Sequence, residues 1–332
     1  MTTFGINGIG RVGKYVLKFL LSNNIKPEWI NDSAGNIQIH RHLLEFDTVH
    51  GKWDANFSNN DTTISIDDKK LLFTNYNKIE ELRLDGIDII LDCTGVFKSQ
   101  KKLETYFDKG VKKVIVSAPV KEKEVANLVY GVNPEAYNPK THKVITAASC
   151  TTNCLAPIIK VIHSNIGIIH GSITTIHNAT NSQTLVDRPG KDLRRSRSSL
   201  NSLIPTTTGS ASAISLIYPD LKGKLNGHAV RVPLLNSSLT DCVFEVKRDT
   251  STLEANNLFK EASESYLKDI LGYEEAQLVS ADYVNDERSA VVDASSTMVI
   301  NKRQLKVYAW YDNEIAYAKR MVDICKYISA SL

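Results

Sequence analysis

The chain has 332 residues, of which 42% are hydrophobic and 23% are charged, and its net charge at pH 7 is +3. A chain of this length can form two domains, each with its own core, and the composition is ordinary for a globular enzyme. The small net charge gives no reason to expect a nucleic acid partner.

The five cysteines have no regular spacing. They indicate a reducing compartment, and they lack the paired spacing that binds zinc, so we expect no metal. The first residues enter a predicted strand without a charged leader or an apolar signal core, and no apolar run is long enough to span a membrane. We therefore expect a cytoplasmic protein with no membrane partner.

Short apolar strands alternate with helical stretches in the first half of the chain. The strand Phe4–Ile6 leads into Asn7-Gly8-Ile9-Gly10-Arg11-Val12-Gly13, and an apolar pattern of helical period follows. In this position a G-x-G-x-x-G segment predicts dinucleotide binding, because glycines permit a tight turn and close approach of the backbone to a pyrophosphate at a helix N-terminus. The alternative is an ordinary glycine-rich turn.

The next predicted strand, Glu28–Asn31, ends at Asp32, about twenty residues after the glycines, where a carboxylate can accept hydrogen bonds from an adenosine ribose. Residues 87–95 and 113–119 are apolar runs that end in small or polar residues, as buried parallel strands do. The first half therefore predicts an α/β Rossmann nucleotide-binding domain.

Cys150 follows a predicted strand, Lys143–Thr146, and the N-cap type residue Ser149. It should therefore lie in the first turn of a helix, where free N–H groups and the positive helix end favour a thiolate and could also hold an oxyanion. His177, further along the chain, is a candidate base. The alternative for a cysteine is core packing, which we expect for Cys154, although Cys154 could also form a disulfide with Cys150 under oxidation.

Beyond Cys150 the pattern changes to longer alternating runs, such as Ala229–Val232 and Cys242–Val246. These runs predict an α+β catalytic domain with a mostly antiparallel sheet. Residues 315–328 form an amphipathic pattern that predicts a closing helix.

Residues 181–208 are rich in Ser, Thr and Arg and predict a long ordered loop, functional or at an interface. The basic cluster Asp192–Arg197 could be a solvated surface or a nucleic acid patch, but interleaved acids and the absence of aromatic residues disfavour the latter. Thr206–Gly209 and Arg231 offer hydroxyl, backbone and guanidinium donors suited to a small phosphate.

Four segments together resemble the phosphorylating glyceraldehyde-3-phosphate dehydrogenases, and the match covers nearly the whole chain. They are the glycine-rich segment 7–13, Ala148-Ser149-Cys150-Thr151-Thr152-Asn153-Cys154, Thr174-Thr175-Ile176-His177 and Trp310-Tyr311-Asp312-Asn313-Glu314. Residues 192–195, 204–209 and 225–233 fall where that family has its subunit-contact loop and phosphate sites. Within the family, residues 42–53 and 239–246 most resemble the branch associated with arsenate resistance.

The resemblance implies a homotetramer that oxidises D-glyceraldehyde 3-phosphate to 1,3-bisphosphoglycerate with inorganic phosphate and NAD, with NADP as an alternative cofactor. It implies a nucleotide domain of residues 1–149, completed by a C-terminal helix of residues 314–332, and a catalytic domain of residues 150–313. The branch resemblance adds arsenate in place of phosphate, which would give 1-arseno-3-phosphoglycerate.

The resemblance also implies a role for each matching residue. Cys150 would attack the aldehyde and His177 would accept the proton. The implied cofactor residues are Asn7, Gly8, Gly10, Arg11, Val12, Asp32, Ser33, Ser117 and Asn313, the last orienting the nicotinamide carboxamide. The attacking phosphate would be bound by Ser149, Thr151, Thr208 and Gly209, and the phosphate of the substrate by Thr180, Arg195 and Arg231.

The sequence departs from the commoner family pattern at three places. Ser33 and Arg188 replace leucines that NAD-specific relatives often have, and both could favour NADP, with Arg188 coming from a neighbouring subunit. Ile315-Ala316 replaces an aromatic residue and a glycine, which leaves the packing near Asn313 open.

Two other functions are compatible with these segments. Erythrose-4-phosphate dehydrogenase is disfavoured by Thr208-Gly209. A non-enzymatic, nucleotide-binding redox sensor would leave His177 and the anion sites without a purpose.

Overall fold

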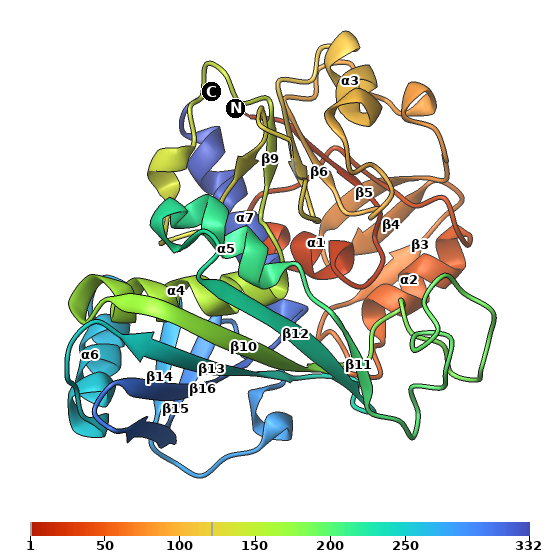
Figure 1. Cartoon of the computed structure of the whole chain (residues 1–332). Coiled ribbons are helices and arrows are strands. Elements are labelled where there is room, and N and C mark those ends of the chain that lie inside the picture. The colour runs from red at the N-terminus through yellow and green to blue at the C-terminus, as the bar shows by residue number, and fades with distance from the viewer. Residues whose placement is uncertain (1, 121) are drawn as a thin grey trace. The chain divides into compact units, whose positions relative to one another are not determined.

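The computed structural model describes residues 2–120 and 122–332, which form two compact units (Figure 1). The first unit contains the residues up to Ser149 together with Tyr317–Leu332, and the second contains Cys150–Ala316. No helix in the described ranges combines the length and the apolar character that crossing a bilayer requires.

The first unit contains a nine-stranded sheet in the order β3-β4-β5-β2-β1-β6-β7-β9-β8. Strands β5 to β8 in this order pair in parallel, and β3 and β4 add an antiparallel edge. The strands are β1 (Phe4–Asn7), β2 (Trp29–Asn31), β3 (Phe57–Asn59), β4 (Thr63–Ile66), β5 (Lys69–Thr74), β6 (Ile89–Asp92), β7 (Lys113–Val116), β8 (Ala126–Asn127) and β9 (Val144–Thr146). Every residue of β1, β2, β6, β7 and β9 is buried, as in a sheet covered on both faces, and the Rossmann prediction is confirmed.

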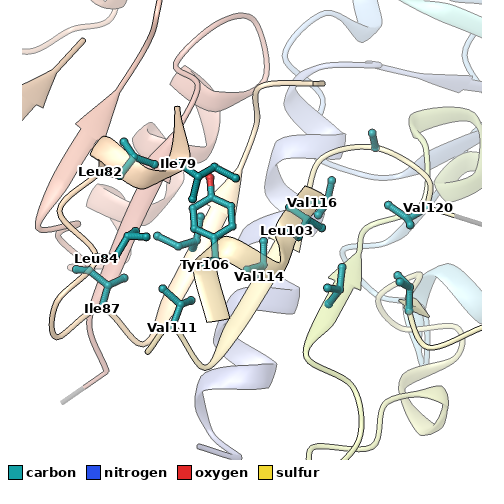
Figure 2. Close-up of a cluster of buried hydrophobic side chains, with 14 of the residues drawn as sticks. Ile79, Leu82, Leu84, Ile87, Leu103, Tyr106, Val111, Val114, Val116 and Val120 are labelled. Atoms are coloured by element: carbon teal, nitrogen blue, oxygen red, sulfur yellow. The ribbon is translucent and has the colours of Figure 1, made fainter. Parts of the chain in front are cut away.

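The helices of this unit are α1 (Gly13–Ser22), α2 (Ile37–Glu45), α3 (Gln100–Asp108) and most of α7 (Ile315–Ser329). Helix α3 buries Leu103 and Tyr106 completely in a cluster that includes Ile79, Leu84 and Val114 (Figure 2). The cluster fixes α3 against the sheet.

The second unit contains a seven-stranded sheet in the order β11-β12-β10-β13-β16-β15-β14. Only β10 with β12 and β14 with β15 pair in parallel, so the prediction of a mostly antiparallel sheet is confirmed. The strands are β10 (Ile168–Asn178), β11 (Ile204–Thr207), β12 (Leu225–Val232), β13 (Ser238–Val246), β14 (Leu271–Glu274), β15 (Ala290–Ile300) and β16 (Gln304–Tyr311). Helices α4 (Cys150–Asn165) and α6 (Thr252–Glu264) pack on this sheet, and α5 (Ser210–Ile217) packs on α4 and β12 (Figure 1).

The predicted loop 181–208 is wrong at its C-terminal end. Residues 181–203 contain only turns and an isolated bridge between Thr184 and Ser198, but Ile204–Thr207 forms β11 beside β12. The side chains of these four residues alternate between buried and exposed positions, as in a strand with one covered face. Ile204 and Thr206 are buried, while Pro205 and Thr207 are exposed.

Candidate active site

Cys150 and His177 lie beside each other in the second unit. Cys150 is the first residue of α4, as its sequence context predicts, and His177 is the penultimate residue of β10. The Cys150 Sγ atom is 3.7 Å from His177 Nε2. A thiol and an imidazole in this contact are the minimum that cysteine-based covalent catalysis requires.

The turn before Cys150 is held in an uncommon conformation. Ala148 has a φ of 52°, in the left-handed region that side chains other than glycine rarely adopt. Its N–H donates to Thr146 Oγ1 at 3.0 Å, and its carbonyl accepts from the Tyr317 hydroxyl at 3.2 Å. Such a conformation persists where surrounding bonds fix it, which is common at functional sites.

Arg231 contacts Nδ1, the ring nitrogen of His177 that faces away from Cys150. Arg231 Nη1 is 2.7 Å from His177 Nδ1, and the Asn178 carbonyl oxygen is 2.9 Å from the same Nδ1. A guanidinium can only donate, so the arginine contact requires a lone pair on Nδ1 and places the imidazole proton on Nε2, toward the sulfur. The carbonyl is satisfied separately, because Arg231 Nη1 also donates to it at 3.0 Å.

Burial dominates the electrostatics of this pair. Burial, and after it the charge of Arg231, together lower the pKa of His177 to about 3, so the imidazole is neutral at pH 7. Burial also raises the pKa of Cys150, although Arg231 opposes this increase. The helix position alone suggested a lowered thiol pKa, but burial outweighs the effect of the helix.

Two side chains that the sequence analysis did not assign position the pair. Asn178 fixes the end of β10, because its amide donates to the Leu235 carbonyl at 2.7 Å and accepts from Ser238 Oγ at 2.9 Å. The Tyr311 hydroxyl lies 2.8 Å from Thr151 Oγ1, and its ring centroid is 6.1 Å from that of His177. Tyr311 belongs to the segment 310–314. A buried tyrosine hydroxyl needs a hydrogen-bond partner, so the tyrosine in this segment was the sequence feature that could have indicated a positioning role.

Two arginines, Arg231 and Arg195, bring positive charge toward Cys150 and His177. The Arg231 Nε atom is buried and has no hydrogen-bond partner among the described residues. The positive charge of Arg195 is near enough to lower the pKa of Arg231, after the larger effect of burial. A buried donor without a partner beside a second positive charge fits an anionic ligand.

In the part of the chain that the structure describes, the other predicted anion-binding residues form hydrogen bonds with separate partners and do not form one connected cluster. Arg195 Nε donates to Thr206 Oγ1 at 2.8 Å, and Thr208 Oγ1 pairs with Ser210 Oγ at 3.1 Å beside Gly209, at the start of α5. Thr180 Oγ1 donates to Gln183 Oε1 at 3.1 Å. Among the described residues no hydrogen bond joins Thr180 or Thr208 to either arginine. Ser149 belongs to the first unit, while Thr151 belongs to the second.

A separate cavity of about 160 Å³ lies in the first unit, at the carboxyl ends of the parallel strands. It contains five of the predicted cofactor residues and seven that were not predicted. Its lining is Asn7, Gly8, Gly10, Asp32, Ser33, Tyr76, Asn77, Lys78, Cys93, Thr94, Val96 and Phe97. Ligands of doubly wound sheets bind at this edge.

The three glycines of the turn have different reasons to be glycine. Gly8 has a φ of 90°, and a Cβ there would lie 2.7 Å from Thr94 N. A Cβ on Gly13 would collide with the Gly8 carbonyl oxygen, whereas one on Gly10 would meet no atom within 4 Å. Packing of the chain itself therefore requires Gly8 and Gly13, and the open space at Gly10 fits close approach of a ligand.

Asp32 is held in place and keeps acceptor capacity. Its carboxylate accepts from the N–H groups of Ile9 and Ala34, each at 3.0 Å, and it lines the cavity. A carboxylate has about four lone-pair sites, so it can accept ribose hydroxyls in addition.

Arg11, Val12 and Ser117 are outside the set that lines this cavity. The Arg11 guanidinium binds Asp47, with Nη2 at 3.2 Å from Oδ1, and Lys14 binds the same carboxylate. Burial alone would raise the pKa of Asp47, but the hydrogen bonds from Arg11 and Lys14 hold it well below its usual range. Val12 directly precedes α1 and Ser117 directly follows β7.

Asn313, in the second unit, has a free acceptor. Its Oδ1 atom is buried without a hydrogen-bond partner among the described residues. A carboxamide N–H₂ group, such as that of nicotinamide, would satisfy this oxygen. In the first unit, the open space at Gly10 and the held carboxylate of Asp32 fit a dinucleotide.

Comparison with known proteins gives one consistent family. Residues 2–100 match the model for the NAD binding domain of glyceraldehyde 3-phosphate dehydrogenase, and residues 149–313 match the model for its C-terminal domain. The chain is 54% identical to glyceraldehyde-3-phosphate dehydrogenase 3 of Nostoc sp. (strain PCC 7120 / SAG 25.82 / UTEX 2576), covering 99% of this chain and 98% of the relative. It is 44% identical to glyceraldehyde-3-phosphate dehydrogenase of Geobacillus stearothermophilus, covering 98% of each chain. The chain therefore belongs to the glyceraldehyde 3-phosphate dehydrogenase family, and its N-terminal domain is the NAD-binding domain of that family.

Proposed function

We propose that this protein oxidises D-glyceraldehyde 3-phosphate to 1,3-bisphosphoglycerate, with NAD as the hydride acceptor and inorganic phosphate as the second nucleophile. The observation that carries the proposal is the 3.7 Å contact between Cys150 Sγ and His177 Nε2 beside Arg231. The names of the relatives support this aldehyde as the substrate, and the contact supports the covalent chemistry.

In the proposed reaction the Cys150 sulfur attacks the aldehyde carbon and forms a thiohemiacetal. His177 accepts the proton of the thiohemiacetal hydroxyl as the carbonyl re-forms, and the product on Cys150 is a thioester. Bound NAD supplies the acceptor for the hydride that leaves the same carbon. A phosphate oxygen then attacks the thioester carbon, the carbon–sulfur bond breaks, and the Cys150 sulfur recovers a proton from His177.

We infer that substrate binding activates His177 through Arg231. Arg231 Nη1 lies 2.7 Å from Nδ1, which leaves Nε2 carrying the proton and unable to accept another. A phosphate group bound by Arg231 would draw the guanidinium away from Nδ1. The imidazole proton could then move to Nδ1, which would donate to the Asn178 carbonyl oxygen. In the structure this oxygen is 2.9 Å from Nδ1. Nε2 would then carry a lone pair and could act as the base.

For the substrate phosphate we propose Thr180, Arg195 and Arg231, and for the attacking phosphate Ser149, Thr151, Thr208 and Gly209. The unpartnered Nε of Arg231 and the nearby charge of Arg195 support the first set. Hydroxyl and backbone donors near the N-terminus of α5 support the second. For the cofactor we propose Asn7, Gly8, Gly10, Arg11, Val12, Asp32, Ser33 and Ser117 in the first domain and Asn313 in the second.

NADP is a second candidate cofactor. Ser33 and Lys78 line the same cavity as Asp32, so a hydroxyl and an ammonium are available to a 2′-phosphate that Asp32 would repel. Arg188 lines a different cavity in the second unit, with Lys191 and Arg195, and would need a neighbouring subunit to contribute. If Arg188 of a neighbouring subunit binds the 2′-phosphate, Arg188→Leu lowers kcat/KM for NADP but not for NAD. If instead the cavity of a single subunit binds the 2′-phosphate, Lys78→Ala lowers kcat/KM for NADP but not for NAD.

Arsenate is proposed as an alternative to phosphate, which would give 1-arseno-3-phosphoglycerate. It is tetrahedral and similarly charged, so hydroxyl and backbone donors cannot easily reject it. The branch resemblance, and not the site chemistry, supports a role in arsenate resistance. If that role holds, a strain that lacks the gene loses arsenate tolerance and keeps growth on sugar; the opposite phenotype identifies a central metabolic enzyme.

We propose a homotetramer in a cytoplasmic, reducing compartment. All five cysteines are free thiols, which suits that compartment. Apolar side chains on residues 181–203 are at least 64% exposed at Leu185, Val186, Leu193, Leu200 and Leu203, which suits a surface that another subunit covers.

Steady-state kinetics test the proposed reaction. We expect NAD reduction with D-glyceraldehyde 3-phosphate that depends on phosphate, and a lower kcat/KM with erythrose 4-phosphate. His177→Asn should lower kcat by about 10²- to 10⁴-fold, the usual contribution of a general base. A preference for erythrose 4-phosphate would favour the related dehydrogenase, and no turnover with either aldehyde would leave a nucleotide-binding redox sensor.

A further inference from the structure

The last residues of four neighbouring parallel strands in the first unit carry polar side chains, and three of these side chains are buried. Thr74, Asn31, Asn7 and Asp92 end β5, β2, β1 and β6, and the strand register places each beside the next. Asn7, Asn31 and Asp92 are at most 4% exposed. Buried polar groups are costly unless they are hydrogen-bonded, so their partners are informative.

These side chains form one continuous chain of hydrogen bonds, and Tyr106 is its only member from a helix. Thr74 Oγ1 donates to Asn31 Oδ1 at 2.8 Å, and Asn31 Nδ2 donates to Asn7 Oδ1 at 2.8 Å. Asn7 Nδ2 donates to the Tyr106 hydroxyl at 2.7 Å, and this hydroxyl donates to Asp92 Oδ2 at 3.0 Å. The phenol therefore joins the half of the chain on β1 to the half on β6.

Asn31 and Asp92, which lie on opposite sides of Tyr106 in this chain, hold two parts of the wall of the nucleotide cavity. Tyr76 N–H donates to Asn31 Oδ1 at 2.9 Å, and Asn31 Nδ2 donates to the Tyr76 carbonyl at 2.9 Å. Thr94 donates to Asp92 Oδ1 from its N–H at 3.1 Å and from its hydroxyl at 2.7 Å. Tyr76 and Thr94 both line the cavity, so a change in the chain would move its wall.

The aromatic ring of Tyr106 is fixed. It is fully buried among aliphatic side chains that include Ile79, Leu103 and Val114 (Figure 2). A close-packed surrounding leaves the ring no alternative position. The position of the hydroxyl is therefore set by α3 and not by the strands that it joins.

We propose that Tyr106 is a positioning residue of the nucleotide cavity, whose hydroxyl keeps the turns after β5 and β6 at the spacing that the adenosine part of NAD requires. This inference rests on the proposed NAD binding and adds a residue that does not itself line the cavity.

The charge of Asp92 supplies a readout specific to this hydroxyl. Burial raises the pKa of Asp92 to about 6, against the hydrogen bonds from Thr94 and Tyr106, which favour the carboxylate. Tyr106 and Cys93 are titratable groups that interact with Asp92; burial raises the pKa of each, so both stay neutral between about pH 5 and 8. Loss of the phenol would raise the pKa of Asp92 further.

The test is Tyr106→Phe, which removes only the hydroxyl. Tyr137→Phe is the matched control, because Tyr137 belongs to the same unit and packs on Tyr327 and His142. The dissociation constant for NAD is measured by calorimetry on the whole protein from pH 5.5 to 8, together with kcat and Tm. We expect Tyr106→Phe to raise Kd about 5- to 50-fold at pH 8, as for a buried partner left unpaired, with kcat at saturating NAD within about twofold.

The pH dependence separates positioning from a general loss of stability. NAD affinity of the parent should fall as pH falls through about 6, and in Tyr106→Phe this fall should occur at higher pH. Asp92→Asn should abolish it, which gives a second reading if Tyr106→Phe does not fold. Parent-like Kd and pH profiles in the folded variants overturn the inference, whereas a parent protein that binds no NAD overturns the proposed function as well.

Discussion

At the scale of single residues, a neutral buried histidine beside a guanidinium is the central feature of the catalytic unit. His177 is 5% exposed, and Arg231 donates toward its Nδ1 from 2.7 Å. Both burial and this charge oppose protonation of the ring, which is why its pKa falls to about 3. The histidine is therefore neutral at pH 7, at a cost in stability under acidic conditions.

The first prediction concerns this cost. Between pH 6.5, the ordinary pKa of histidine, and about 3, the unfolded chain binds a proton at His177 that the folded chain does not. Stability is therefore complete above pH 6.5 and falls as pH falls, by up to about 1.4 kcal/mol per pH unit from this group. The free energy of unfolding, measured with urea at pH 7.5, 6 and 5, should depend less on pH in His177→Asn than in the parent, by about 2 kcal/mol between pH 7.5 and 5.

His228→Asn is the control for this prediction, because His228 is an exposed histidine on β12 in the same unit. It should leave the pH dependence as in the parent. An equal pH dependence in His177→Asn and the parent would mean that His177 is readily protonated in the folded state.

At the scale of secondary structure elements, the glycines in the turn between β1 and α1 have different roles. Some are required by the packing of the chain itself, and one leaves space for a ligand. Gly13 sits against the Gly8 carbonyl, and the space around Gly10 is open. The same short motif therefore contains residues with structural and with binding functions, and substitution by alanine distinguishes them.

The second prediction follows from this difference. Gly13→Ala should destabilise the protein by several kcal/mol or prevent folding, because the added carbon overlaps a backbone oxygen. Gly10→Ala should keep the Tm within a few degrees and weaken NAD binding by about tenfold or more, since backbone approach to the pyrophosphate is blocked. Thermal unfolding and NAD titration check both. A Gly10→Ala protein with parent affinity would show that NAD does not approach this residue.

The elements that sequence could predict are those with a local signal. The glycine-rich turn, the apolar runs of β6 and β7, and the start of α4 at Cys150 each depend on neighbouring residues in the chain. The structure shortens the predicted strands, because 87–95 and 113–119 become Ile89–Asp92 and Lys113–Val116. Strands β3 and β4 were not predicted, since they are short and only partly buried.

The interactions that sequence could not predict join residues far apart in the chain. Arg231 was assigned to a phosphate, and its contact with His177 depends on the parallel register that places the two opposite each other on β12 and β10. Asn7 was assigned to the cofactor, but its side chain is used by Asn31 and Tyr106. Tyr106 fits an ordinary apolar helix face, and only the packing of α3 brings its hydroxyl to Asp92.

At the scale of the whole molecule, the exposed apolar residues of the segment 181–203 concern assembly. Leu193 is 88% exposed and Val186 is 74% exposed. Single exposed leucines are ordinary, but five such residues in one irregular segment indicate a covered surface in the assembled protein. We therefore expect this segment to contact another subunit.

The third prediction tests this contact. Leu193→Asp should shift the protein from the proposed tetramer toward smaller species, because a carboxylate would be buried in the interface. Leu253→Asp is the control, since Leu253 is 71% exposed on α6, outside this segment. Analytical ultracentrifugation measures both variants. Unchanged sedimentation of Leu193→Asp, or an equal shift in the control, would mean that the segment is not an interface.

The central claim is that Cys150 carries the acyl group between oxidation and phosphorolysis. The most direct measurement mixes the enzyme with NAD and D-glyceraldehyde 3-phosphate without phosphate, follows NADH formation in the first turnover, and analyses the protein by mass spectrometry. We predict a burst of NADH stoichiometric with active sites, a 3-phosphoglyceryl thioester on Cys150, and its release when phosphate is added, with none of these in Cys150→Ser. A burst without an adduct on Cys150, or turnover by Cys150→Ser at a rate near that of the parent, would contradict the account.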